Sequence, residues 1–390
     1  MANTLTGLIP DIYEALDLVL REQVGLIPAV YLSAATERAA LNQTIISPVA
    51  PAATATDVTP GVTPPDDGDQ TIGNVQLSIA KARRVPVRWN GEQSMALDAP
   101  GGIGRDRIQR DQFAQGIRTL INEVENDLAA LHMYASRAVG TAGTTPFAFS
   151  ATRSGFEDVA DVRQVLVDNG SPLSDMQLVL GTTAGARLRS LAQLNNAQAS
   201  ADVSFLRQGV LLPIHGMDIR ESGAIDTHTK GTAASATTNT AGYAMGATTI
   251  ALAVAGTGTM VAGDVIMFAG DTNKYVVVTG DADVSDGGSI VLAAPGLRQA
   301  IPASATAITV VGNSVRSMAF HRQGIVLAAR VPARPKEKDL AEDVTIITDP
   351  RSGLSLEVAL YKQYRQIQYE ISLAWGVKVA KPELLALLLG

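Results

Sequence analysis

The chain has 390 residues, of which 46% are hydrophobic and only 4% are aromatic, and its formal charge is −7. This length is enough for two or three domains with a sizeable core. The lack of cysteine excludes disulfides, thiolate metal sites and a cysteine nucleophile. The acidic balance argues against tight, non-specific binding of nucleic acid.

No targeting or membrane segment is evident. The N-terminal Met-Ala-Asn-Thr lacks the basic and apolar regions of a signal peptide. No stretch approaches the roughly 18 uninterrupted apolar residues that a membrane helix needs. We therefore expect a chain made in a reducing cytoplasm, with no membrane partner.

The first predicted element is an amphipathic helix over residues 11–23. Its apolar residues share one face, and its other faces carry acidic side chains. Gly25 and Pro28 are expected to end it. The acidic face consists of Asp11, Glu14, Asp17 and Glu22.

A proline-rich extended segment follows at residues 44–80. Its prolines fix the backbone and remove donors, and residues 66–69 (Asp-Asp-Gly-Asp) are a strong turn signal. One interpretation is a disordered linker. We favour a long two-stranded loop with its tip at residues 60–69, because residues 75–89 alternate in polarity like a strand.

A single long helix is predicted over residues 105–139. Its apolar positions recur at helical spacing and form one continuous stripe. A helix of that length would span roughly 50 Å. The stripe consists of Ile117, Leu120, Ile121, Val124, Leu128 and Leu131.

Helices and strands then alternate up to residue 225, which indicates a mixed α/β unit. The predicted helices cover residues 154–169 and 182–194, and the predicted strands cover residues 176–180, 210–214 and 217–219.

The composition changes at residue 226. Residues 227–246 are rich in Thr, Ala and Gly, and short β runs separated by Gly, Asp or Pro continue to about Arg316. Such runs are typical of a small sandwich or barrel. The C-terminal part, residues 317–390, is predicted to be mostly β, and residues 382–389 could be either a helix or a strand. The predicted strands of the insert cover residues 249–254, 264–269, 274–279, 289–292 and 307–311.

No catalytic constellation is found in the sequence. The four histidines, His132, His215, His228 and His321, form no metal-binding pattern. Residues 99–104 resemble a nucleotide loop only in part, because Arg107 replaces the third glycine. Residues 281–287 lack the spacing of a calcium loop, so a hairpin turn is the better interpretation. We expect no catalysis, no cofactor and no metal.

Charge is unevenly distributed. Residues 81–118 hold eight basic and four acidic residues, a local +4, whereas residues 202–298 hold five basic and nine acidic residues, a local −4. These are either solvated faces or complementary surfaces between neighbouring subunits, which would fix their register. The candidate interface residues are Pro60, Asp66, Asp67, Asp69, Arg83, Arg84 and Arg88.

Three stretches carry a family resemblance. They are residues 261–270 (Val-Ala-Gly-Asp-Val-Ile-Met-Phe-Ala-Gly), residues 343–358, with Thr-Asp-Pro-Arg-Ser-Gly at 348–353, and residues 373–383 (Leu-Ala-Trp-Gly-Val-Lys-Val-Ala-Lys-Pro-Glu). With the order of parts along nearly the whole chain, they make the sequence resemble the major capsid (coat) proteins of tailed phages, of the phage P22 type. The insert is shorter and richer in Gly, Ala and Thr than that family suggests.

The resemblance implies the α+β Hong Kong 97 (HK97) capsid fold with an inserted small antiparallel β-barrel domain. The implied parts are an N-terminal arm (1–43), an extended loop (44–80), a peripheral domain (81–153) with a spine helix (105–139), an axial domain (154–225), the insert (226–316) and a C-terminal return (317–390).

The resemblance also implies a function. Such proteins form hexamers and pentamers that assemble into an icosahedral virion capsid in the host cytoplasm and enclose double-stranded DNA, with a scaffolding protein and a portal as partners. Scaffold contact would fall on Asp11, Glu14 and Asp17. The alternatives are an encapsulin-like nanocompartment shell, against which the insert argues, and a surface adhesion module, which a secretion signal would favour.

Overall fold

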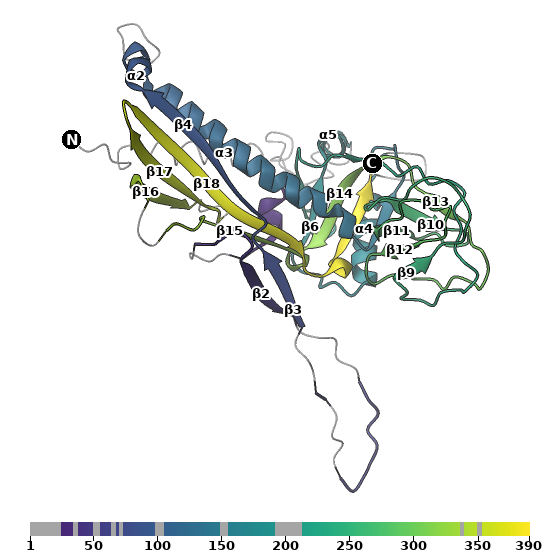
Figure 1. Cartoon of the computed structure of the whole chain (residues 1–390). Helices are drawn as coiled ribbons and strands as arrows, with labels where there is room; N and C mark the ends of the chain where they lie inside the picture. Colours follow the sequence, from purple (N-terminus) through teal and green to yellow (C-terminus); the bar gives the residue numbers. More distant parts are fainter. Residues whose placement is uncertain are drawn as a thin grey trace, which may run out of the picture.

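The computed structural model describes residues 25–33, 38–49, 55–63, 68–69, 73–97, 105–148, 155–191, 213–335, 339–348 and 353–390. The molecule is elongated, with a long helix lying along a β-sheet at one end and a second sheet at the other (Figure 1). A thin hairpin projects away from the region between them (Figure 1). The predicted helix at residues 11–23, with Asp11, Glu14 and Asp17, lies outside the described residues, as do Asp66 and Asp67.

Both helices and strands build the chain, which agrees with the predicted α+β class. The α-helices are α2 (Gly91–Leu97), α3 (Arg105–Ala129), α4 (Glu157–Asp168) and α5 (Thr182–Arg189). Short 3-10 helices cover Ile27–Ala29, Ala130–Tyr134, Arg322–Gly324 and Pro382–Leu384. The strands up to the insert are β1 (Tyr31–Leu32), β2 (Thr44–Val49), β3 (Gly73–Ser78), β4 (Lys81–Asn90), β5 (Arg137–Gly140), β6 (Met176–Leu180) and β7 (Met217–Glu221). The later strands are β8 (Thr227–His228), β9 (Thr249–Ala251), β10 (Val265–Phe268), β11 (Lys274–Thr279), β12 (Ser289–Leu292), β13 (Ile308–Val310), β14 (Ser314–His321), β15 (Ile325–Arg330), β16 (Ala341–Thr348), β17 (Ser355–Gln363), β18 (Gln366–Val379) and β19 (Leu385–Leu389).

The first sheet is organised by β18. Its strand order is β1-β15-β18-β17-β16, and β4 pairs with the other side of β18. β4 runs antiparallel to β18 over its full length, from Lys81 opposite Trp375 to Asn90 opposite Gln366. Among the described residues, β4 and β16 each have a single neighbouring strand and are edges of this sheet.

Helix α3 covers the first sheet with the apolar stripe that the sequence predicts. Ile117, Ile121, Val124 and Leu128 are each 0% exposed, and they belong to one core cluster with side chains of β4, β17 and β18. Gly116 allows the close approach, because a Cβ there would lie 3.3 Å from Val85 Cγ1.

The predicted C-terminal end of this helix is wrong. Helix α3 ends at Ala129, a 3-10 turn continues to Tyr134, and residues 137–140 form β5, so the spine does not reach residue 139. Strand β5 pairs in parallel with β19 and antiparallel with β11. These pairings, made with distant parts of the chain, replace the helical hydrogen bonds that the local sequence would support.

The second sheet has the strand order β13-β10-β11-β5-β19-β14-β6-β7, with β12 and β9 beside β11 and β8 beside β14. Val159, Val162 and Leu166 of α4, with Leu188 of α5, form a core cluster with strands of this sheet. Residues 382–389 resolve into a 3-10 turn and strand β19.

The insert has a core of its own. Fifteen buried residues between Ala233 and Ile308 form a cluster separate from the other core clusters. Strand β11 nevertheless pairs with β5, so the sheet runs without a break from the insert into the body. Strand β14 begins at Ser314 and crosses the predicted boundary at Arg316.

A buried carboxylate joins three distant segments. Glu125 of α3 is 2% exposed and accepts hydrogen bonds from the backbone N–H groups of Leu26 and Ile27, at 3.0 and 2.9 Å. It also accepts one from the Ser222 hydroxyl at 2.8 Å. Burial raises the pKa of Glu125, and these hydrogen bonds oppose the rise. Gly25 is required beside it, because a Cβ there would collide with the Glu221 carbonyl.

The stripe on α3 gives a stability prediction. Leu128→Ala should lower the free energy of unfolding by about 2–5 kcal/mol, because the fully buried side chain would leave a cavity. Urea unfolding followed by circular dichroism measures the loss. Asn126→Ala, at an exposed position on the same helix, should change it by less than about 0.5 kcal/mol. Equal midpoints for the two variants would contradict the packing described here.

Candidate assembly interface

The described residues offer surfaces and joints more clearly than a catalytic pocket. Within them, no group of three or more His, Asp and Glu side chains is arranged to hold a metal ion. None of the described helices is long and apolar enough to cross a membrane. The candidate interface features are the projecting arm, the basic strand β4, the polar network beside it and the junction with the insert.

The arm, residues 44–80, is a hairpin whose strands β2 and β3 pair antiparallel from Thr44 opposite Ser78 to Val49 opposite Gly73. Its base is fixed to the body. Leu77 and Ile79 are buried in a cluster with residues of β15 and β18, and the Ile79 N–H donates to the Gln43 carbonyl at 3.0 Å.

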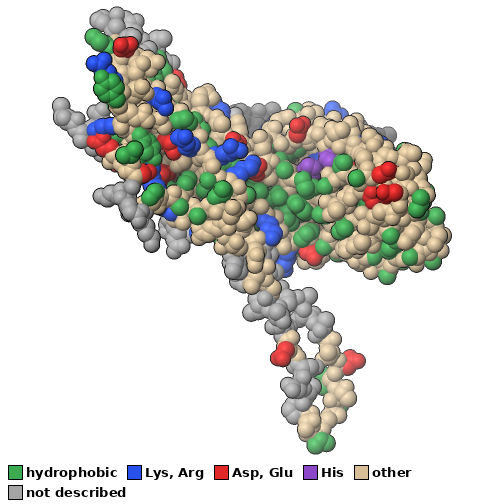
Figure 2. Space-filling model, in the orientation of Figure 1, with side chains coloured by type: hydrophobic (Ala, Val, Ile, Leu, Met, Phe, Trp, Pro, Cys, Tyr) green, Lys and Arg blue, Asp and Glu red, His purple; other side chains and the backbone are tan. Residues whose placement is uncertain are grey.

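Beyond the base, the described residues of the arm are exposed. Residues 55–63 are all exposed, and Val58 and Val62 have relative exposures of 96% and 106%. The predicted interface residues Pro60 and Asp69 lie on this exposed part. Figure 2 shows acidic side chains and no basic ones on the visible face of the arm. The sequence of residues 44–80 contains four aspartates and no Lys or Arg.

Strand β4 carries the opposite charge. Lys81, Arg83, Arg84 and Arg88 lie along it, and residues 81–90 contain no acidic residue. Each basic side chain also has a partner in its own chain. Arg83 and Arg84 keep relative side-chain exposures of 59% and 60%. Those intrachain pairs are Lys81–Asp127 at 2.6 Å, Arg83–Glu123 at 3.6 Å, Arg84–Glu370 at 2.7 Å and Arg88–Gln368 at 3.1 Å.

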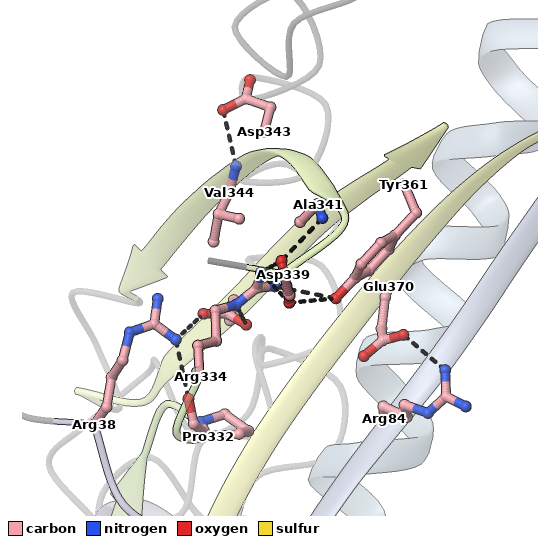
Figure 3. A network of polar contacts seen from close by, with 11 residues as sticks. Arg38, Arg84, Pro332, Arg334, Asp339, Ala341, Asp343, Val344, Tyr361 and Glu370 are labelled. Carbon is pink, nitrogen blue, oxygen red and sulfur yellow. Dashed lines mark hydrogen bonds and ion pairs between the residues drawn. The ribbon is translucent and has the colours of Figure 1, made fainter. Parts of the chain in front are cut away.

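A polar network lies beside β4 on the first sheet (Figure 3). The carboxylate of Glu357, on β17, is buried and pairs with both Arg38 and Arg334, the latter at 2.8 Å. Arg334 also binds both oxygens of Asp339, at 2.9 and 2.8 Å. Asp339 accepts a hydrogen bond from the Ala341 N–H at 2.9 Å. The network thus fixes the segment that leads into β16.

The polar network borders a pocket of about 290 Å³ that reaches Arg83 and Arg84 of β4. A larger pocket of about 490 Å³ lies between β4 and α3, where Val85, Val87 and Ile108 face it together with Arg88. Basic and apolar groups therefore lie together along β4, which suits an extended, acidic peptide.

At the junction with the insert, charged groups are buried together. Asp264, 0% exposed, accepts hydrogen bonds from the Val261 N–H at 2.9 Å and the Gly231 N–H at 3.1 Å, and its Oδ1 lies 3.0 Å from His228 Nε2. Arg316, 2% exposed, has no hydrogen-bond partner for its guanidinium among the described groups. Burial lowers the pKa of Arg316 to about 10, and Asp264 opposes the shift.

His132 completes this junction. It lies in the 3-10 turn after α3, its Nδ1 is 3.0 Å from the Ala129 carbonyl oxygen, and its ring meets that of His228 edge-on at 5.5 Å between centroids. The pKa of His132 is lowered to about 4, chiefly by burial, with smaller contributions from the charges of His228 and Arg316. The imidazole is therefore neutral at pH 7. His132 and His228 are both half-buried, and Figure 2 shows histidine side chains on the visible face of the molecule.

The structure places the predicted site residues unevenly. Arg83, Arg84 and Arg88 lie together on β4, while Pro60 and Asp69 lie on the arm, away from β4. Asp11, Glu14, Asp17, Asp66 and Asp67 fall outside the described residues. Sequence reasoning missed Glu357 and Arg316, since nothing local marks a charged residue on a strand as buried, and it missed Arg334, whose partners Glu357 and Asp339 only the fold brings together.

No protein-family model matches the chain, and a search of the curated proteins finds no relative. Among solved structures, one titled Mycobacterium phage Che8 matches with 12% identity and a TM-score of 0.44, covering 90% of this chain and 88% of that one. The capsid of cyanophage P-SCSP1u matches with 12% identity and a TM-score of 0.48, covering 94% and 88%. A virus-like particle from Pyrococcus furiosus matches with 7% identity and a TM-score of 0.40, covering 97% of each chain. None of these likenesses assigns a residue to a site.

The His132 environment predicts a pH dependence. Because its folded pKa, about 4, lies below the ordinary value of 6.5, its stabilising contribution is complete above pH 6.5 and is lost as the pH falls toward 4. The loss is at most about 3 kcal/mol. Between pH 7 and pH 4.5, the urea midpoint of unfolding should fall more for the wild type than for His132→Asn. The Asn amide can still donate to the Ala129 carbonyl, so this variant keeps the hydrogen bond and loses the titrating group. The same pH dependence in both proteins would contradict this role.

Proposed function

We propose that this chain is the structural subunit of a self-assembling shell, the major capsid protein of a tailed phage with the HK97 fold. The observation that carries the proposal is the arm. It is fixed to the body at its base and exposes its valines to solvent beyond it. Neither catalysis nor a cofactor is part of this function.

An arm of this kind does not stabilise its own subunit. An isolated two-stranded hairpin is marginal in water unless a third strand or another surface covers it. Exposed apolar residues on an extended segment bury nothing within the chain, so a binding surface on another molecule gives them a use. In a shell, every subunit is surrounded by copies of itself.

Charge indicates which surface the arm binds. The arm contributes −4, and residues 81–90, which follow it directly, contribute +4. Because the arm points away from its own β4, the complementary surface is the β4 of a neighbouring copy (Figure 1). The proposed contact joins Pro60, Asp66, Asp67 and Asp69 of one subunit to Arg83, Arg84 and Arg88 of the next.

The contact repeats from head to tail. A heterologous interface of that kind closes into rings when the rotation between copies allows it, as hexamers and pentamers require. The further partners of the proposed function are a scaffolding protein at Asp11, Glu14 and Asp17, a portal, and packaged double-stranded DNA that is contacted weakly because the chain is acidic.

The direct test is assembly of the purified chain. Sedimentation velocity and negative-stain electron microscopy over a range of salt concentrations should reveal closed particles or rings. Monomers or dimers alone, at every salt concentration and with added phage scaffolding protein, would reject the proposal.

The arm contact predicts the effect of reversing charge on β4. Arg84→Glu should reduce particle yield several-fold, because it places like charges at every copy of the interface, although each exposed pair is worth only about 0.2–1 kcal/mol. Asp69→Arg in the same chain should restore part of the yield.

Lys230→Glu makes the same change of charge on an exposed residue of the insert and serves as the control. Melting temperatures separate a loss of assembly from a loss of folding. Equal yields for Arg84→Glu and Lys230→Glu would remove β4 from the interface.

A further inference from the structure

Two edge strands of the first sheet, β4 and β16, are built differently. On β4, Pro86 removes a backbone donor in mid-strand, and basic side chains flank it. Both features are ways in which proteins prevent a sheet edge from pairing with another strand. β16 has neither feature, since its sequence contains no proline and no basic residue, and the irregularity in its pairing with β17 is confined to its start, between Ala341 and Asp343.

The second half of β16 has the composition of a regular strand. Residues 344–348 are all β-branched, the class most enriched in strands. Ile347 is buried in the core below the sheet, whereas Ile346 is 44% exposed and the preceding Leu340 is 90% exposed. Among the described residues, β17 is the one strand that pairs with β16.

The strand is held in position before any partner arrives. Asp339, just before β16, is fixed by Arg334 (Figure 3), and Glu342 of β16 pairs with Lys362 of β17. The Val344 N–H donates to the carboxylate of the adjacent Asp343 at 2.8 Å. Little conformational freedom is therefore lost when another strand adds to this edge.

We propose that the β16 edge pairs antiparallel with the β16 edge of a second copy of this chain, continuing the sheet across a two-fold axis. This inference extends the proposed shell function, because it joins subunits at a surface separate from the arm contact.

Charge selects both the partner and the direction. The arm of another copy is acidic, and so is the start of β16, at Asp339, Glu342 and Asp343. The basic edge of another β4 is interrupted by Pro86. A second β16 meets neither obstacle when it runs antiparallel.

The register explains this compatibility. In an antiparallel pair centred between Val344 and Thr345, Asp343 lies opposite Ile346, so the acidic half of each strand faces the uncharged half of the other. A parallel pair in register would place Asp343 opposite Asp343 and Glu342 opposite Glu342, and like charges directly opposite destabilise a sheet. Either arrangement would cover the exposed Ile346, but the antiparallel one does so without this repulsion.

The small area that one strand pair buries determines when this contact persists. One strand pair is small beside the roughly 1,200–2,000 Å² that a stable complex buries. Between lone subunits it therefore forms transiently, and it persists where other contacts hold copies together. A trapping experiment suits such a contact.

The lack of native cysteine makes trapping clean. Single-cysteine variants of the full chain are made at β16 (Val344→Cys, Thr345→Cys, Ile346→Cys and Thr348→Cys), with Leu340→Cys as the end control. Each is oxidised with copper phenanthroline, both as dilute subunits and under assembly conditions, and disulfide-linked dimers are quantified on non-reducing gels.

The antiparallel pair predicts a maximum of dimer at residues 344 and 345, at least several-fold above residue 340. Two copies of residue 340 would lie roughly 30 Å apart at a rise of about 3.3 Å per residue. Random collision would instead favour Leu340→Cys, whose position is the most exposed of the set.

Hydrogen exchange gives a second, independent measurement on the unmodified chain. The amides of residues 341–348 should exchange more slowly as protein concentration rises. The exchange rates of the β4 amides should change less, because β4 takes no part in this strand pairing.

Each outcome decides the inference. Dimer yields that are equal at all positions, or highest at residue 340, overturn it, as do amides of β16 already protected at the lowest concentration, since the chain itself would then cover the edge. Uniform cross-linking along 344–348 would mean a parallel pair and would overturn the register. Particles that form normally without the central cross-links reject this inference and leave the shell function standing. Central cross-links without particles would support the β16 pairing and reject the shell function.

Discussion

The architecture depends on the burial of one apolar stripe. Along α3, Ile117, Ile121, Val124 and Leu128 close one face of the first sheet, so β4, β17 and β18 are held in place by a single helix. The same helix then leads, through the turn at residues 130–134, into β5 at the centre of the second sheet. Because the stripe fixes the helix in register, it also fixes the relation between the two sheets. Any change that loosens the helix would therefore act on both ends of the molecule.

Buried charges mark the joints that this helix alone does not fix. Glu125 holds the backbone of residues 26 and 27, Glu357 holds Arg38 and Arg334, and Asp264 holds the neck of the insert near Arg316. Pairs of this kind add little net stability, because desolvation offsets their attraction, but breaking one strands a buried charge. They are better understood as devices that accept one arrangement of distant segments and reject others. Arg316 fits this view least well, since its guanidinium has no hydrogen-bond partner among the described groups.

Local pattern was sufficient where a segment's structure depends on its own residues. The strands at Met176–Leu180, Lys274–Thr279 and Ser289–Leu292 have the predicted bounds, and the predicted stripe on α3 is buried. The predicted end of the long helix was wrong because residues 137–140 form a strand that pairs with β11 and β19. Helix α2 was not predicted from the sequence. The intrachain partners of the basic run could not be foreseen either, because Arg84 meets Glu370 and Arg88 meets Gln368 only after β4 pairs with β18. Residues that would contact a second subunit could be predicted from the sequence only by their charge, because no local pattern marks such a contact.

The two proposed contacts differ in symmetry, and together they could close a shell. The arm on a neighbour's β4 is heterologous, since a different surface is used on each side, and such a contact repeated around an axis makes a ring. A ring has no means of joining other rings through that contact once it is closed. The pairing of β16 with β16 is isologous, so it links two copies across a two-fold axis without consuming either partner of the arm contact. In these proposals, the contrast between the blunted edge at Pro86 and the edge at residues 344–348 would separate the two roles on opposite sides of one sheet. If β4 were as open as β16, edge pairing would compete with arm binding for the same strand, and the subunits would lose the directionality that a shell of defined size requires.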